Sequence, residues 1–122
     1  MTPAEAMERI NELASHVWMV RTFLKHCDEA QEDDELMEVP RELYDYLHAL
    51  GPAWSERDTA SYLKLAKKKL GKLKAASEKY TALQPEISSH TNFQTAAHSL
   101  AVAVREIAAV LESLQAEPGS RS

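Results

Sequence analysis

Five histidines and a single cysteine are the residues of this 122-residue chain whose side chains are best suited to metal chemistry. The spacings that build metal sites in helical bundles, such as Glu-x-x-His and His-x-x-x-His, do not occur. Cys27 and His90 fall on the apolar stripes of two predicted helices, at ends that meet if those helices are antiparallel. His26 and Glu86 are close enough in sequence to complete a ligand set. Thiolate, imidazole and carboxylate suit Zn²⁺, so this end is a candidate zinc site; the alternative is a small buried thiol beside a histidine at a helix end.

Another histidine, His98, stands within the sequence Ala97-His98-Ser99-Leu100. This stretch resembles the start of the Ala-His-x-Leu-Lys-Gly signature of histidine phosphotransfer domains, which are also helical bundles. The resemblance implies that His98 is a phosphoacceptor. Ala101 and Val102 occupy the positions where the signature has lysine and glycine, and the histidine lies on the last predicted helix rather than on an internal one.

Two arginine–histidine pairs offer a different chemistry. The segments from Arg21 to His26 and from Arg41 to His48 each resemble the Arg-x(4–6)-His pattern of HEPN-type RNases, in which arginines and histidines of two subunits form a catalytic cleft. The resemblance implies an RNase activity for a dimer of this chain. The alternative is that these side chains line the solvated edges of amphipathic helices.

The hydrophobic pattern predicts four amphipathic helices that position these side chains. Thr2, Pro3 and Glu5 have the form of a capped helix start, and the apolar residues that follow recur at alternating steps of three and four. Gly51-Pro52 and Gln84-Pro85 are predicted to interrupt the pattern. The predicted helices run from Thr2 to about residue 31, from Leu36 or Val39 to Leu50, from Ser55 to about Tyr80, and from Ser88 or Ser89 to Leu114.

These helices predict an all-α protein: an antiparallel up-down four-helix bundle whose second helix is shorter than the others. Residues 1–116 are expected to form one domain and residues 117–122 a disordered tail. The single cysteine excludes an internal disulfide framework. The longest nearly apolar run, Val17–Val20, is too short to cross a membrane. We therefore expect a cytoplasmic protein that does not act on a membrane.

The first predicted helix is apolar around most of its circumference near its middle. Trp18, Met19 and Phe23 lie outside the buried stripe that a four-helix bundle requires. One interpretation is that this helix is the most buried of the four. The other is a contact surface for a partner, with Trp54 as a further apolar anchor, because exposed tryptophan, methionine and phenylalanine are typical of such surfaces.

Charge is separated along the chain, although the net charge is only −5. Residues 28–45 hold nine acidic residues against one arginine, and residues 57–79 hold eight basic residues against two acidic ones. These segments are predicted to orient the protein against a partner, since exposed charge pairs add little to stability. The residues expected to do so are Glu32, Asp33, Asp34, Glu35, Lys64, Lys68 and Lys72. An acidic chain without aromatic residues among these lysines is unsuited to nucleic acid.

The sequence therefore favours a non-catalytic interaction or assembly protein that binds itself or another protein, as a homodimer or as a small subunit. No cofactor is predicted apart from the candidate zinc ion. The alternatives are the Cys27/His90 metal or ligand site and, on the resemblances above, a histidine phosphotransfer-like or HEPN-like protein.

Overall fold

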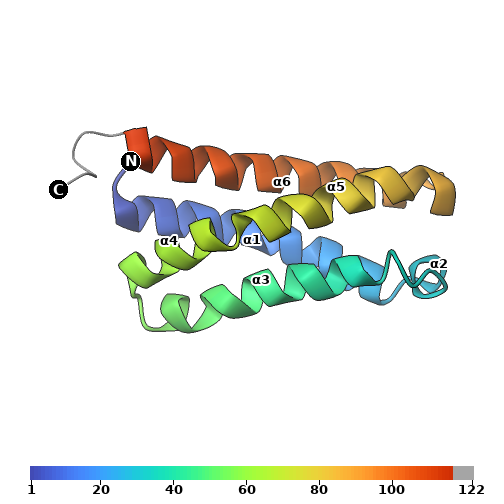
Figure 1. Ribbon diagram of the computed structural model, residues 1–122, viewed down its shortest axis with the longest axis horizontal. Coiled ribbons are helices and arrows are strands. Elements are labelled where there is room, and N and C mark those ends of the chain that lie inside the picture. The colour runs from blue at the N-terminus through green and yellow to red at the C-terminus, as the bar shows by residue number, and fades with distance from the viewer. Residues whose placement is uncertain (117–122) are drawn as a thin grey trace.

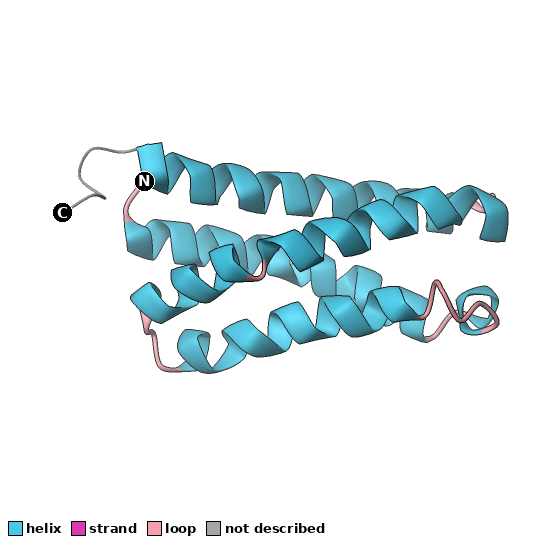
Figure 2. Cartoon of the chain, in the orientation of Figure 1, coloured by secondary structure: helices cyan, strands magenta, loops and turns pink. Residues whose placement is uncertain are grey.

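The computed structural model describes residues 1–116 and is all-helical over that range, with six helices and no strand (Figures 1 and 2). The predicted tail, residues 117–122, lies outside the described residues. The helices are α1 (Pro3–Lys25), α2 (Asp28–Gln31), α3 (Glu38–Ser55), α4 (Thr59–Lys68), α5 (Leu70–Ile87) and α6 (Thr91–Ala116).

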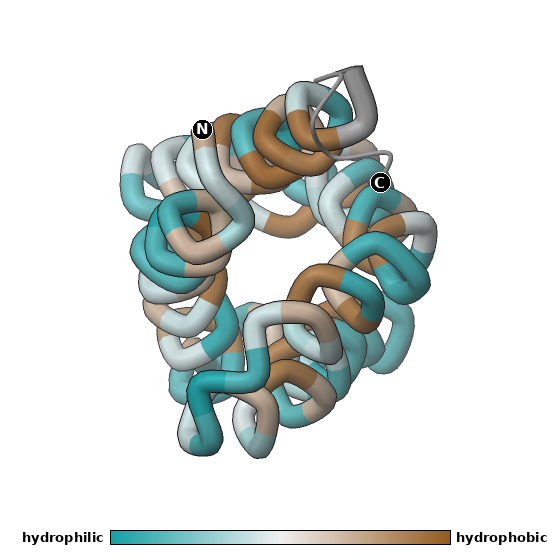
Figure 3. The backbone as a smooth tube through the Cα atoms, turned by 90° about the vertical axis from the view of Figure 1, so that its left-hand side faces the viewer, coloured by the Kyte–Doolittle hydropathy of each residue, from teal (hydrophilic) through white to brown (hydrophobic). Residues whose placement is uncertain are grey.

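Four rods lie side by side along the long axis, formed by α1, by α3, by α4 and α5 together, and by α6 (Figure 1). The helix α1 packs against α6, α3 and α4, whereas α5 packs against α6 and α3. Seen along the axis, the rods surround a common interior, and apolar positions recur along each of them (Figure 3). Within residues 1–116 no helix combines the length and the apolar character needed to span a membrane.

The helix α1 begins as the sequence predicts. The Thr2 hydroxyl accepts a hydrogen bond from the Glu5 backbone N–H at 3.1 Å, and the Glu5 carboxylate accepts one from the Thr2 N–H at 2.8 Å. The predicted apolar stripe is buried along its length, from Ile10 to Leu24. The predicted end near residue 31 is wrong, because the backbone of Cys27 is extended (φ −96°, ψ 124°) and separates α1 from the single turn of α2.

The helix α3 continues through Gly51-Pro52, where the sequence predicted a stop. Pro52 has no N–H to donate, which removes one hydrogen bond of the helix. The carbonyl that loses this partner is that of His48, an exposed residue, so water can satisfy it. Leu50 and Ala53, on either side of Gly51-Pro52, are buried in the core. Burial of these two side chains holds the helix together as far as Ser55.

The turn between α3 and α4 is built on a residue with left-handed backbone, Arg57 (φ 55°). The Asp58 N–H donates to the Ala53 carbonyl at 2.8 Å, which satisfies one of the last carbonyl groups of α3. The Asp58 carboxylate then accepts a hydrogen bond from the Ser61 N–H at 3.1 Å and caps α4. The sequence placed this cap three residues earlier, at Ser55, which instead belongs to α3.

The predicted third helix is divided into α4 and α5 at Lys69, and α5 continues through Pro85 to Ile87. The division is mild, because Lys69 donates to the Leu65 carbonyl and accepts from Leu73 as a helical residue would. It lies next to Gly71, where helix propensity is weakest. Most of the predicted apolar stripe remains buried across it: Ala66, Leu73, Ser77 and Tyr80 are buried, and Leu63 and Leu70 are half-buried.

The last helix, α6, begins at Thr91 rather than just after Ser88 or Ser89. His90 supplies the cap: its Nδ1 accepts a hydrogen bond from the Asn92 N–H at 3.0 Å. The Ser88 hydroxyl accepts from the His90 N–H at 3.1 Å and fixes the turn before it. The predicted stripe on this helix is buried from Phe93 to Leu111.

Candidate functional site

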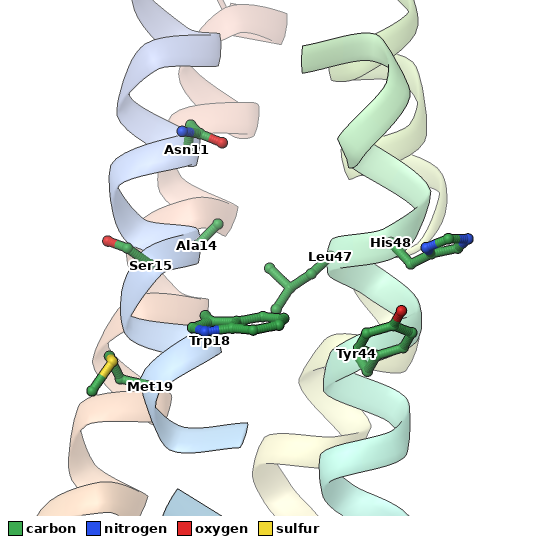
Figure 4. A pocket seen from close by; sticks show the side chains of 8 residues that line it. All are labelled: Asn11, Ala14, Ser15, Trp18, Met19, Tyr44, Leu47 and His48. Carbon is green, nitrogen blue, oxygen red and sulfur yellow. The ribbon is translucent and has the colours of Figure 1, made fainter. Parts of the chain in front are cut away.

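Three large hydrophobic side chains remain exposed on one side of the molecule. The exposed fractions are 44% for Trp18, 64% for Met19 and 41% for Tyr44. They line an open cavity of about 530 Å³ between α1 and α3 (Figure 4). The remaining lining residues are Asn11, Ala14, Ser15, Leu47 and His48. We refer to Trp18, Met19, Arg21, Tyr44 and His48 as the aromatic surface.

The rings of the aromatic surface are linked across the two helices. The ring centres of Trp18 and Tyr44 lie 6.5 Å apart, and Tyr44 stacks on His48 at 5.7 Å. In Figure 4 the Trp18 indole extends from α1 across the cavity toward Leu47 and Tyr44 of α3. The Arg21 guanidinium lies 4.6 Å from the centre of the Trp18 ring and 5.1 Å from that of Tyr44. Stacking against a cation restrains both rings.

Helix geometry explains why these rings are exposed. Trp18 directly follows the buried Val17, and Tyr44 directly follows the buried Leu43. Consecutive helical residues are separated by about 100° around the axis, so each ring lies beside its core stripe rather than within it. Because α1 and α3 are neighbours, the two rings meet at the seam between them.

A smaller pocket of about 250 Å³ adjoins the aromatic surface and shares Tyr44 with it. Arg21, Lys25 and Arg41 line this pocket together with Met37 and Pro40, and none of its lining residues is acidic. The end of the aromatic surface nearer to Lys25 is therefore basic.

The structure separates the four residues predicted to bind a partner. Trp18 and Met19 are exposed neighbours, but Phe23 is half-buried and packs edge-on against Phe93, with ring centres 5.2 Å apart. Trp54 is also half-buried, at the other end of α3, where the Arg57 guanidinium covers its ring at 4.1 Å.

Sequence reasoning missed Tyr44. Its signal was the spacing of Tyr44 and His48, four residues apart, which places both on one face of a helix. That face could be assigned to the surface only once α3 was known to lie beside the Trp18 side of α1.

The charged segments contact each other at one well-defined place. The Lys79 ammonium lies 2.5 Å from a Glu38 carboxylate oxygen and 3.5 Å from one of Glu42, joining α5 to α3. The Lys79 hydrogen bond and charge lower the pKa of Glu38. Among the residues predicted to orient a partner, Asp33 is half-buried and its carboxylate accepts a hydrogen bond from the Leu36 N–H at 2.8 Å.

The other predicted charged residues, Glu32, Asp34, Glu35, Lys64, Lys68 and Lys72, are exposed. Lys72 also lines a cavity of about 540 Å³ between α3 and α5, together with Lys69, Glu42 and Asp45. Both signs of charge are therefore present in that cavity.

The predicted zinc end brings two of its four residues together. Cys27, which follows α1, and His90, which precedes α6, line a pocket of about 170 Å³. The Cys27 thiol donates a hydrogen bond to Glu29 at 2.9 Å, and burial, with this bond, raises the pKa of Cys27. His26 and Glu86 are exposed and do not line this pocket. Within residues 1–116 no group of three histidine, cysteine or acidic side chains is placed to hold a metal ion.

The remaining histidine predictions concern α6 and the two arginine–histidine pairs. His98 is exposed on α6, as a phosphoacceptor would have to be. The two arginines, Arg21 and Arg41, line the same pocket. His26 caps the end of α1, whereas His48 belongs to the aromatic surface.

No protein-family model, curated protein sequence or solved structure matches this chain. The function is therefore inferred from the geometry of the surfaces described above.

Proposed function

We propose that the protein is an antiparallel up-down four-helix bundle that acts as an assembly protein, binding through the aromatic surface without a catalytic step. We further propose that the partner at the aromatic surface is a second copy of this chain, so that the protein acts as a homodimer. The observation that carries the proposal is the exposure of Trp18, Met19 and Tyr44 side by side on α1 and α3.

The composition of the aromatic surface supports a protein–protein contact. Tryptophan, tyrosine, methionine and arginine are enriched at the centres of interfaces, and tryptophan, tyrosine and arginine contribute most of the binding energy there. Trp18, Tyr44 and Arg21 already hold one another in place, so little side-chain entropy is lost when a partner covers them.

The dimensions of the two helices are also sufficient. The 23 residues of α1 span about 34 Å, and the 18 residues of α3 span about 27 Å. A stable interface of ordinary size buries about 800 Å² of each partner. That area is about a ninth of the accessible surface of 7204 Å² of this chain.

Sedimentation equilibrium tests the proposal directly. The wild-type protein is expected to dimerise, and the double variant Trp18→Ser/Met19→Ser to be monomeric at the same concentration. The matched control is Lys74→Ser/Glu78→Ser, which removes two exposed side chains of α5 and should leave the dimer intact. A wild type that stays monomeric up to about 1 mM, where even an association of about −4 kcal/mol populates the dimer, would contradict the proposal.

A zinc ion at the Cys27/His90 pocket stays a second, separate prediction. The observation that favours it is that the Cys27 thiol and the His90 imidazole, two of the ligand types that zinc takes, line one pocket. Metal analysis of the purified protein, with Cys27→Ser and His90→Ala as comparison variants, tests it. The expected result is that the wild type binds zinc and that both variants lose it. A wild type that contains no metal and is no less stable without added zinc would contradict this prediction.

A further inference from the structure

The buried stripe of α4 and α5 contains one charged residue, Lys69. The stripe advances by alternating steps of four and three residues, and its other positions are fully buried and uncharged: Tyr62, Ala66, Leu73, Ala76 and Tyr80. Lys69 is half-buried, and its ammonium makes no hydrogen bond or ion pair with any residue of the range 1–116. An apolar side chain here would extend the core without placing a charge beside it, so stability does not explain the lysine.

Lys69 lines the cavity of about 540 Å³ between α3 and α5. Lys72, one turn further along α5, lines the same cavity and also makes no ion pair within residues 1–116. Asp45 and Glu42 line the cavity from α3. The Glu42 carboxylate already lies 3.5 Å from the Lys79 ammonium, whereas Asp45 has no such partner in the described chain. The cavity therefore presents two unpaired ammonium groups from one helical rod and an unpaired carboxylate from the other.

The remaining lining of this cavity consists of Tyr46, His48 and Ala49 of α3. The Tyr46 hydroxyl donates a hydrogen bond to the Ala66 carbonyl at 3.1 Å, so its ring is held between α3 and α4. Small-molecule sites have volumes of about 300–1,000 Å³ and combine an apolar wall with a few charged or polar groups. Both the volume and the lining of this cavity match that description.

We propose that this cavity binds a free amino acid, with its carboxylate at Lys69 and Lys72 and its ammonium group at Asp45. A ligand with a single charge is attracted by one wall of the cavity and repelled by the other, whereas a zwitterion is attracted by both. The binding step also supplies the partner that the half-buried Lys69 ammonium lacks. The site is separate from the proposed dimer contact, since His48 is the one residue that lines both this cavity and that of the aromatic surface.

Amide NMR titration tests the requirement for both charges. Each protein amino acid is added in turn to the wild type below about pH 7, where amino groups are largely protonated, and the resonance of Ala49 is followed. The tightest binder is expected to have a Kd of about 1 mM or lower, and its N-acetyl and amide derivatives, which keep one charge each, to bind at least about tenfold more weakly. Absence of saturable binding by any amino acid, or equal binding of the N-acetyl derivative, would overturn the proposal.

Charge-neutral variants locate the site. Lys72→Gln and Asp45→Asn should each raise the Kd of the tightest binder about tenfold, because each removes one charged contact. The matched controls are Lys74→Gln and Glu78→Gln, which neutralise exposed residues of α5 outside the cavity and should leave the Kd unchanged. Controls that weaken binding as much as the cavity variants would show that the amino acid binds elsewhere and overturn the proposal.

Lys69→Met separates binding from folding. Methionine continues the apolar stripe, so this variant should unfold at a higher urea concentration than the wild type and yet bind the amino acid at least about tenfold more weakly. Opposite effects on stability and on binding are not expected of a lysine whose role is structural. A Lys69→Met protein that binds as tightly as the wild type, or that is less stable than it, would overturn the role given to Lys69.

Discussion

The guanidinium carbon of Arg21 lies 4.6 Å from the centre of the Trp18 indole, one helical turn away on the same face of α1. The same guanidinium is 5.1 Å from the centre of the Tyr44 ring, so one cation joins α1 to α3 at the surface. The contact keeps an exposed tryptophan in a fixed position and brings a positive charge to the edge of the apolar cavity.

Arg21→Met should therefore destabilise the monomer although Arg21 is not in the core. Methionine keeps much of the apolar stem but removes the charge above the two rings, a loss of about 0.5–1 kcal/mol in the free energy of unfolding. Urea unfolding of the wild type and of Arg21→Met, at a concentration low enough to keep both monomeric, measures this difference. Arg105→Met on α6 is the control, because Arg105 is exposed and has no described ring contact. Equal stability of the two variants would mean that the stacked geometry contributes nothing in solution.

Two buried tyrosines offer a matched test of hydrogen bonding in the core. Tyr80 and Tyr62 are both fully buried, but the Tyr80 hydroxyl donates to the Phe93 carbonyl at 2.9 Å, whereas the Tyr62 hydroxyl has no hydrogen-bond partner. Tyr80→Phe should lower the free energy of unfolding by about 1 kcal/mol, because it removes a buried hydrogen bond between the side chain of α5 and the backbone of α6. Tyr62→Phe should be neutral or stabilising, since it removes a buried unpaired group. Thermal unfolding of the two variants compares them, and the opposite ranking would refute this assignment of partners.

The same burial predicts loss of stability in alkali. Burial raises the pKa of Tyr46, Tyr62 and Tyr80 above the ordinary value of 10.0. The fold therefore favours the neutral phenol, and this contribution is fully present below pH 10 and is lost as pH rises above it. Helical circular dichroism and phenolate absorbance should change together in an alkaline titration. Complete ionisation of the tyrosines in a protein that remains helical would contradict the prediction.

The apolar periodicity predicted most of the core, because burial of a continuous stripe dominates helix packing. The stripes of α1 and α6 are buried nearly as predicted, and Cys27 and His90 line one pocket. The helix ends were predicted less well. Gly51-Pro52 does not stop α3, because the buried residues on either side outweigh one lost hydrogen bond.

The candidate site was predictable only in part, since residue type does not determine which side chains neighbouring helices cover. Trp18 and Phe23 look alike in the sequence, yet Phe23 is covered by Phe93 of α6 while Trp18 meets only the edge of α3. Trp54 is covered by Arg57, whose position depends on its left-handed backbone. The sequence does not predict this backbone, because no glycine stands at that position. The exposure of these side chains depends on how neighbouring helices pack, which the residue pattern of a single helix does not predict.

Replacing the glycines of α3 and α5 with alanine is expected to stabilise the protein to different extents. A methyl group at Gly71 would meet nothing within 4 Å, and its φ is not positive, so Gly71→Ala should raise the free energy of unfolding by about 1 kcal/mol. Gly51 is equally open, but Pro52 follows it and disfavours helical backbone for a residue with a Cβ. Gly51→Ala should therefore gain less. Urea unfolding of both variants measures the difference, and a larger gain at Gly51 would contradict it.

The turn at Arg57 allows backbone strain to be separated from side-chain contacts. Arg57 has φ 55°, a conformation that costs a non-glycine residue about 1 kcal/mol, while its guanidinium contacts the Trp54 ring and Glu8. Arg57→Ala and Arg57→Gly both lose those contacts, but only glycine adopts the turn without cost. The glycine variant should thus be more stable than the alanine variant by about 1 kcal/mol in urea unfolding. If the two variants unfold at the same urea concentration, the chain in solution does not close α3 through a left-handed residue, and the hydrogen bond from Asp58 to Ala53 must be absent there as well.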